Sequence, residues 1–162
     1  MTESGRFLKE ILERGRAEAR RSGSTVVEAE HLLLALAAHP GTSAQHVLAA
    51  ADLGRDAVRA ALDREFAVSL RVAGVELSDV DLPVATADPE RAVGLGTSAK
   101  LVLDRAVRRA GLGPGRIRPA HLLLGLLDAE VGTVPRALAL AGVDRLELVR
   151  RARAALAEEE DR

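Results

Sequence analysis

The sequence predicts an all-α protein built from two similar halves. HLLLAL at residues 31–36 returns as HLLLGL at residues 121–126, ninety positions later. Apolar residues recur at the three- and four-residue spacing of amphipathic helices through most of the chain. Only two aromatic side chains occur, so Leu, Val and Ala must form the core. Because a repeated unit buries its apolar face against its copy, we expect two pseudo-symmetric four-helix repeats, about eight helices in all.

Four helices are expected in the first half, over about residues 7–22, 28–38, 43–51 and 58–70. Gly23 ends the first, because glycine is the commonest residue just past a helix C-terminus. His39-Pro40-Gly41 closes the second. Thr42 or Ser43 caps the third, since either hydroxyl can accept from the free amides of a first turn. Gly74 terminates the fourth helix.

The second half opens at Thr97 or Ser98 and repeats the order over residues 99–110, 119–128, 134–141 and 143–156. Pro119 and Pro135 stand where a first helical turn tolerates proline. Between the halves, residues 71–96 carry acids, prolines and no stable apolar period. We interpret them as an irregular connector in which Val75, Leu77, Val80 and Leu82 lie along the helices, although a short strand is possible.

These boundaries predict one domain over residues 1–157. It contains repeat one at residues 4–70, the connector at 71–96 and repeat two at 97–157. Residues 158–162 have nothing to bury and are expected to form a frayed tail.

Composition excludes several classes of function. The net charge is −1, so the chain as a whole offers no basic field for nucleic acid or anionic lipid. There is no cysteine, which fits a reducing compartment. The N-terminus lacks the apolar stretch of a signal peptide, and no run approaches the length of a membrane span. A cytoplasmic protein that does not bind membranes is predicted, with nucleic acid an improbable partner.

The two halves together resemble the double Clp-N repeat, the N-terminal domain of ClpC- and ClpA-type unfoldases. EAEHLLLAL at residues 28–36 and RPAHLLLGL at residues 118–126 stand where that family has G-T-E-H-[IL]-L-L-[GA]-L. AADLGRDAVRAAL and ALAGVDRLELVRR stand where it has a helix ending near a Leu-Gly-Val turn. The resemblance covers nearly the whole chain, apart from a connector that is longer than usual.

The resemblance implies a docking platform for proteins and peptides, without enzymatic activity and without a cofactor. No Walker A loop is present: GLGTSAK at residues 94–100 lacks the second Gly-Lys-Ser/Thr and opens a helix. We therefore expect a Clp N domain without an AAA+ motor, acting as an adaptor or regulator that docks substrates, adaptors or the unfoldase. Two alternatives remain: a decoy for ligands of the unfoldase N domain, and, more distantly, a helical nucleic-acid-binding regulator.

In the ClpC branch, the resemblance also implies recognition of phosphorylated arginine. The Glu of G-T-E-H would pair with the guanidinium, and a Thr near the start of each half would help to hold the phosphate. When the family's motif is aligned with this sequence, its Glu corresponds to Glu30 in the first half and to Ala120 in the second. The two family threonines correspond to Gly5 and Gly96, and Thr97 directly follows Gly96. Glu30, Glu28 and Thr97 are thus the candidate peptide- or phosphoarginine-binding residues. A first-turn carboxylate also has a purely structural role at the helix N-terminus, which Glu28 and Glu30 both fit.

No catalytic or metal site is predicted. His31 and His121 occupy equivalent positions, but the sequence around them lacks a metal-ligand pattern. We expect both to be half-buried, with ring nitrogens hydrogen-bonded across the turn. The chain has no cysteine and no G-x-S-x-G motif, and its serines sit at caps and turns.

Arginine is unusually frequent, since all but two of the 23 basic residues are arginine. Arginines crowd the first helix and its copy: Arg14, Arg16, Arg20, Arg21, Arg105, Arg108 and Arg109. Such clusters could dock acidic partners. Acidic residues interleaved with them favour the alternative, a solvated helix face.

Overall fold

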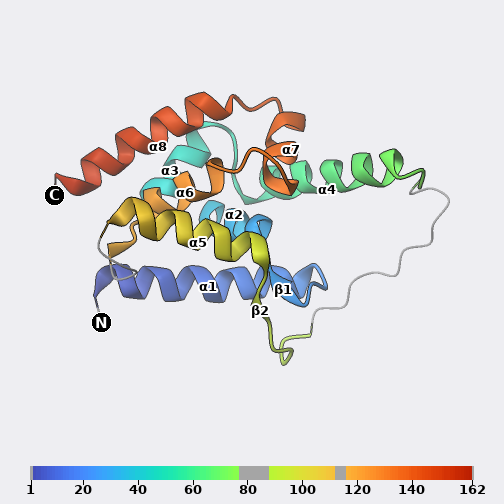
Figure 1. The fold of residues 1–162 in the computed structure, drawn as a ribbon, viewed down its shortest axis with the longest axis horizontal. Helices are drawn as coiled ribbons and strands as arrows, with labels where there is room; N and C mark the ends of the chain where they lie inside the picture. Colours follow the sequence, from blue (N-terminus) through green and yellow to red (C-terminus); the bar gives the residue numbers. More distant parts are fainter. Residues whose placement is uncertain (1, 77–87, 112–115, 162) are drawn as a thin grey trace.

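The computed structural model describes residues 2–76, 88–111 and 116–161. Its elements in chain order are α1 (Glu3–Arg21), β1 (Val26–Val27), α2 (Ala29–Ala37), α3 (Ser43–Ala50), α4 (Arg55–Val72), β2 (Gly94–Leu95), α5 (Thr97–Ala110), α6 (Pro119–Leu127), α7 (Thr133–Leu140) and α8 (Arg145–Glu160). The predicted all-α fold of two four-helix repeats is confirmed, with α1–α4 matched by α5–α8 (Figure 1).

Helix N-termini are fixed by side-chain caps at three places. The hydroxyl of Thr2 accepts from Gly5 N–H at 3.1 Å, and that of Thr42 accepts from Gln45 N–H at 3.2 Å. Asp144 caps α8 in the same way. These caps satisfy amides that have no partner within the helix. Thr42 is therefore the cap of α3, as one of the two sequence alternatives proposed.

The core lies around α2 and α6, the two helices that carry the repeated Leu-rich segment. Residues 32–36 of α2 are at most 1% exposed, and Leu122, Leu123 and Leu124 of α6 are fully buried. α1 packs on α2, and α5 packs on α6 in the matching way. Because α2 and α6 are apolar on all sides, they can be stable only when other helices surround them.

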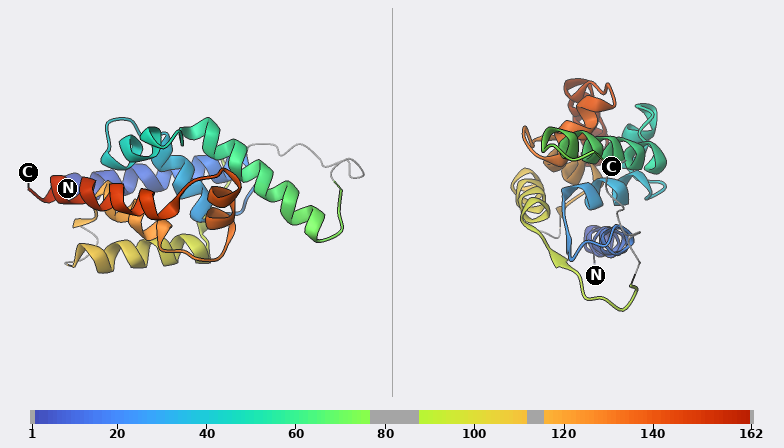
Figure 2. Two further views of the ribbon diagram at one scale, coloured as in Figure 1. Left: turned by 90° about the horizontal axis from the view of Figure 1, so that it is seen from above. Right: turned by 90° about the vertical axis from the view of Figure 1, so that its right-hand side faces the viewer.

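The fourth helix of each half packs on the third helix of the other half. α4 covers α2 and also packs on α7, while α8 covers α6 and also packs on α3. Two views show α4 extending beyond the rest of the bundle along its long axis (Figures 1 and 2). The two halves consequently share one core and are interlocked.

The connector contains the short strand that the sequence left open. Val26 pairs with Gly94 and Val27 with Leu95 in a parallel two-stranded ladder, which brings the start of α2 next to the start of α5. The predicted positions of Leu77, Val80 and Leu82 lie outside the described residues.

One boundary prediction was wrong. α8 does not stop at Leu156 with a frayed tail after it but continues through Glu160. Glu159 accepts a hydrogen bond from Ser43 Oγ at the start of α3. This contact gives the end of α8 a partner in the first half, which sequence periodicity does not reveal.

Candidate functional site

The first turns of α2 and α5 are joined by a reciprocal set of hydrogen bonds. Glu28 precedes α2, and its Oε2 accepts from the backbone N–H of Ser98 at 3.1 Å and from Ser98 Oγ. Ser98 Oγ in turn accepts from Ala29 N–H at 2.8 Å. A carboxylate in this place is stabilised by the free amides and the dipole of α5. Glu28 therefore links the two halves, in addition to its part in the capping box at the start of α2.

This arrangement decides what the neighbouring candidate residues can do. Gly96 is buried directly under the Glu28 carboxylate, and a Cβ at position 96 would overlap that carboxylate. Thr97 is exposed at the first position of α5. The place that the resemblance gives to a ligand phosphate at this helix is thus filled by the chain's own carboxylate.

Glu30 lies two residues after Glu28, in the first turn of α2, where it interacts electrostatically with Arg59 and Glu65 of α4. Burial raises the pKa of Glu30 above its usual value, and the carboxylates of Glu28 and Glu65 add to the effect, while Arg59 opposes it. Its equivalent in α6, Ala120, is fully buried. Of the three candidate residues, Glu28 and Thr97 both lie at the start of α5, where Glu28 bonds Ser98 rather than Thr97, while Glu30 interacts with residues of α4.

The two histidines are structural. His31 and His121 are 4% and 3% exposed. The Nδ1 of His31 accepts from Glu28 N–H at 2.9 Å, and the Nδ1 of His121 accepts from Arg118 N–H at 3.0 Å. The predicted hydrogen bond across the turn is confirmed for Nδ1 in both halves, whereas the buried Nε2 of His121 has no hydrogen-bond partner among the described residues. Both rings are more deeply buried than expected. Among the described residues, no group of three or more His, Cys, Asp or Glu is placed to hold a metal ion.

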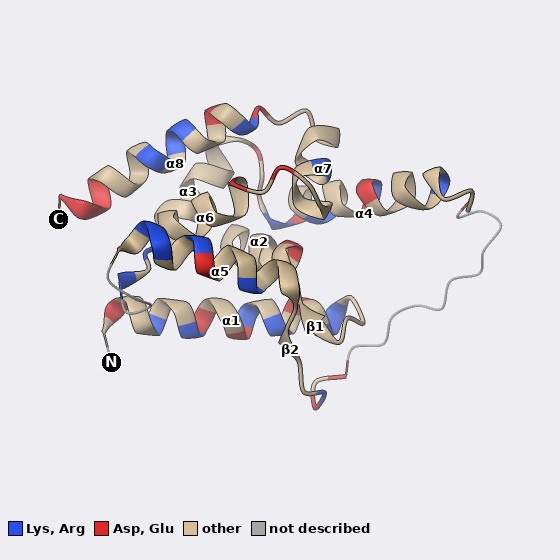
Figure 3. Cartoon of the chain, viewed as in Figure 1, with Lys and Arg blue, Asp and Glu red and all other residues tan. Residues whose placement is uncertain are grey.

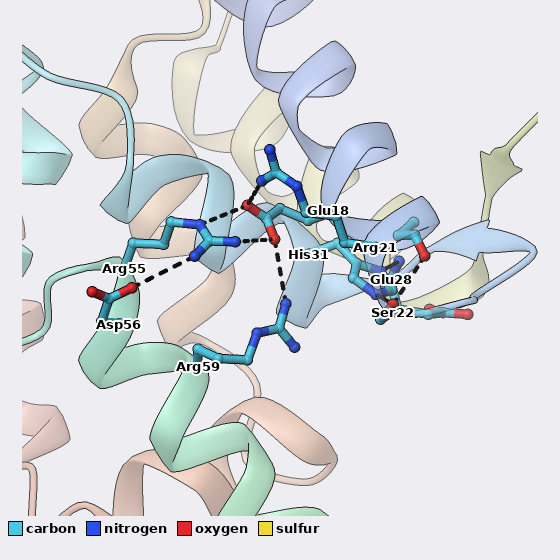
Figure 4. Close-up of polar contacts among 9 residues, drawn as sticks. Glu18, Arg21, Ser22, Glu28, His31, Arg55, Asp56 and Arg59 are labelled. Atoms are coloured by element: carbon cyan, nitrogen blue, oxygen red, sulfur yellow. Dashed lines mark hydrogen bonds and ion pairs between the residues drawn. The ribbon is translucent and has the colours of Figure 1, made fainter. Parts of the chain in front are cut away.

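A cluster around Glu18 was missed by sequence reasoning (Figure 4). Glu18 is 2% exposed, in the C-terminal part of α1. Its Oε1 accepts from Arg55 Nε at 2.9 Å and from Arg21 Nη1 at 3.0 Å. Its Oε2 accepts from Arg55 Nη2 at 3.0 Å and from Arg59 Nη2 at 3.3 Å. We call Glu18, Arg21, Arg55 and Arg59 the Glu18 cluster.

The second half builds the same junction without this cluster. The position equivalent to Glu18 is Arg109, which pairs with Asp128 at 2.6 Å. The position equivalent to Arg55 is Arg145, whose Nη1 donates to the carbonyl of Leu127, the last residue of α6, and to that of Ala129 just beyond it. At this junction, among the described residues, only the first half therefore gathers several guanidinium groups around one buried carboxylate.

Other arginines of the first helix hold the connector. Arg16 Nε donates to the carbonyl of Val93 at 3.3 Å, and Arg20 Nε donates to the carbonyl of Arg91 at 3.0 Å. Figure 3 shows acidic and basic residues interleaved along α1. The sequence favoured a solvated face for this helix. Arg16 and Arg20 instead make tertiary hydrogen bonds to backbone carbonyls of the connector.

A groove of about 480 Å³ lies where the two halves meet. Its walls come from the equivalent turns that follow α3 and α7, with Leu53 and Val143 at matched positions. Arg151 lies along it, and its guanidinium donates to Glu147 at 2.8 Å and to the carbonyl of Ala50 at 3.3 Å.

The equivalent helices of the two halves pack around the Leu-rich pair α2 and α6, an arrangement that defines a class of helical double-repeat domains. The family of the Clp repeat (R) N-terminal domain, Clp_N, matches residues 6–111, and the chain belongs to this family. The match spans α1 to α5; α6, α7 and α8 complete the same fold beyond it. A search of curated proteins found no match. None of the described helices is long and apolar enough to cross a membrane.

Family membership makes this chain a protein-binding module of the Clp type. Domains of this family bind substrates or adaptors rather than carry out catalysis.

Proposed function

We propose that the chain is an adaptor-like or regulatory docking module of a Clp protease system, which contacts the Clp unfoldase, its adaptors or its substrates. The observation that carries this proposal is the Clp_N match across both the first half and α5 of an interlocked double repeat. The described helices present several polar surfaces, whereas the Leu-rich segments of α2 and α6 are buried in the core and cannot contact a partner. A partner protein is therefore expected to bind side chains at the helix N-termini and along α1, α4 and α8.

The partner class is tested by a pull-down with the full chain as bait in native lysate of its source organism. An adaptor or regulator retains the Clp unfoldase, identified by mass spectrometry. A decoy retains clients of the unfoldase N domain and leaves the unfoldase itself in the flow-through. Recovery of neither, against a bait unfolded by the substitution Leu33→Asp in the core, would contradict the proposal.

We further propose that Glu30 is the residue most suited to receive a guanidinium from a peptide ligand. Its carboxylate is partly buried beside two other carboxylates, so a cation arriving there would relieve their mutual repulsion. Glu28 serves this site indirectly, because its carboxylate stays on the amides of α5 next to Thr97.

Phosphoarginine binding is accordingly expected to be weak and confined to one site. Titration calorimetry with free phosphoarginine and with arginine should give at most one site per chain, because Ala120 leaves the second half without a carboxylate. Glu30→Gln should weaken binding by about tenfold or more, as loss of a charged hydrogen-bond partner does. Two equivalent tight sites would contradict the assignment.

A further inference from the structure

We propose that the Glu18 cluster, together with Arg14, is a docking site for an acidic segment of a partner protein. This assignment rests on the proposed docking function and names the chemistry of one partner surface.

The cluster carries more positive than negative charge. Glu18 supplies one buried carboxylate, whereas Arg21, Arg55 and Arg59 each supply a guanidinium that donates to it. Two further acids lie near the cluster. Asp56 stands 3.6 Å from Arg55 and is fully exposed, so solvent screens its contribution, and the half-buried Glu30 interacts electrostatically with Arg59. Several guanidinium N–H groups remain free to donate outward, because each guanidinium has five donors and uses one or two on Glu18.

Two of these arginines, Arg21 and Arg55, border a depression of about 430 Å³ between α1, α2 and α4. Three alanines, Ala17, Ala35 and Ala38, form its small apolar floor. Arg14 stands on its rim, is exposed, and makes no hydrogen bond or ion pair with the described residues. The depression therefore combines room for a side chain with fixed cationic groups at its edge.

The second half shows that the fold does not require this cluster. There, Arg109 replaces Glu18 and Val149 replaces Arg59, yet α5, α6 and α8 adopt the same arrangement as α1, α2 and α4. A buried carboxylate surrounded by arginines is weak evidence for stability, because its desolvation offsets much of its attraction. What Glu18 does achieve is to hold guanidinium groups from two helices in fixed positions, as Figure 4 shows.

The spacing of the arginines favours an acidic segment over a single phosphate group. Arg14 and Arg21 are seven residues apart on one face of α1, which corresponds to about 10 Å along the helix axis. One phosphate cannot bridge that distance, whereas carboxylates three residues apart on an extended polyproline II peptide match it, because that helix has three residues per turn and rises about 3.1 Å per residue. The site thus selects Asp or Glu side chains at every third position of an extended, polyproline II-like segment.

The test uses the full chain and a fluorescein-labelled peptide with Glu at every third position, in fluorescence anisotropy at low and physiological salt. The comparison peptide has Gln in place of Glu. We expect the acidic peptide to bind more tightly at low salt, and the Gln peptide to lose most of the affinity. Arg14→Glu should weaken binding by about tenfold, since it turns an attraction into a repulsion on a residue without a structural contact.

Arg105→Ala is the matched control, because Arg105 occupies the position equivalent to Arg14 on α5. It should leave the affinity within about twofold of wild type, the range of a charge remote from the interface. Equal weakening by Arg105→Ala, unchanged binding in Arg14→Glu, or equal binding of the Gln peptide would overturn the proposal. So would displacement of the peptide by inorganic phosphate at equal concentration.

The outcome is separable from that of the pull-down. Retention of the unfoldase or its clients by wild type, with no acidic-peptide binding, refutes the acidic-segment site alone. Arginine-dependent peptide binding without any Clp component in the pull-down supports the site and refutes the Clp docking function.

Discussion

At the scale of single residues, Glu18 links stability to pH. Burial acts to raise its pKa, but the hydrogen bonds and charges of Arg55, Arg21 and Arg59 outweigh burial, and the pKa lies below its usual value of about 4.5. A carboxyl group with a lowered folded-state pKa adds stability above its unfolded-state pKa and loses it as the pH falls through the folded value.

We therefore expect Glu18→Gln to lower the free energy of unfolding at neutral pH by about 1–3 kcal/mol, the cost of unpairing donors around a charged group. Urea unfolding of wild type should weaken below about pH 4.5, and the variant should show a smaller change in that range. Asp104→Asn, at an exposed ion pair with Arg108, serves as the control and should change stability little at neutral pH. Equal losses in both variants would contradict the role given to Glu18.

His31 gives a second residue-scale prediction. Its Nδ1 accepts a backbone hydrogen bond, so its proton sits on Nε2 and is donated to Ser22 Oγ at 3.0 Å. Burial and the charge of Arg59 lower its pKa to about 4. Nitrogen-15 NMR should show a neutral Nε2–H ring down to about pH 5, and a ring that becomes charged near pH 6.5 would refute the buried arrangement.

The sequence predicted the histidine contacts but missed the Glu18 cluster, and the reason is the range of the interactions. The histidine hydrogen bonds span three residues and repeat in both halves, so the local pattern contains them. Glu18 meets residues 37 and 41 positions away, and its repeat equivalent carries the opposite charge. Such contacts depend on how α1 and α4 cross, which the spacing of apolar residues does not specify.

At the scale of elements, the tightest helix contact differs between the halves. A Cβ at Gly125 of α6 would lie 2.7 Å from the backbone oxygen of Val102 in α5, which cannot move without shifting the helix. A Cβ at Gly15 of α1 would instead meet the side-chain ends of Val27 and Leu32 at 3.2 and 3.3 Å. Flexible side-chain ends can yield by a few tenths of an ångström, whereas a helix backbone yields at greater cost.

We expect Gly125→Ala to destabilise the protein by about 1–3 kcal/mol, the usual effect of overpacking. Gly15→Ala should be close to neutral, because the gain in helix propensity of up to about 1 kcal/mol offsets a small rearrangement. Chemical denaturation of both variants measures the difference. Equal stability would show that α5 and α6 are further apart than the structure has them.

Element boundaries show the same division between local and tertiary information. Helix starts with a local cap, such as Thr42 for α3, were predictable from the sequence. The end of α8 was not, because its last turn contacts Ser43 of α3, and nothing within α8 itself marks that contact.

At the scale of the whole molecule, the repeat in the sequence predicted that the halves pack together, but not which helices cross. α4 lies on α7, where Glu65, 5% exposed, accepts from Arg136 Nε at 2.8 Å. α8 lies on α3, where Arg151 reaches the carbonyl of Ala50. The fourth helix of each half thus covers the third helix of the other half. Because of this exchange, neither half alone can bury all of its apolar faces.

This exchange predicts that the halves are unstable apart. Expressed separately, residues 2–76 and 88–161 should each show less helix by circular dichroism and no sharp thermal transition, because α2 and α6 lose covering helices. Mixing the two fragments should restore helicity in a concentration-dependent manner, since the complete core forms only in the complex. Arg136→Ala in the second fragment should weaken that association by about 1–3 kcal/mol, because it leaves the buried Glu65 carboxylate without its cross-half partner. A first fragment that unfolds cooperatively and as stably as the intact chain would instead show that the two repeats are independent units joined by a tether.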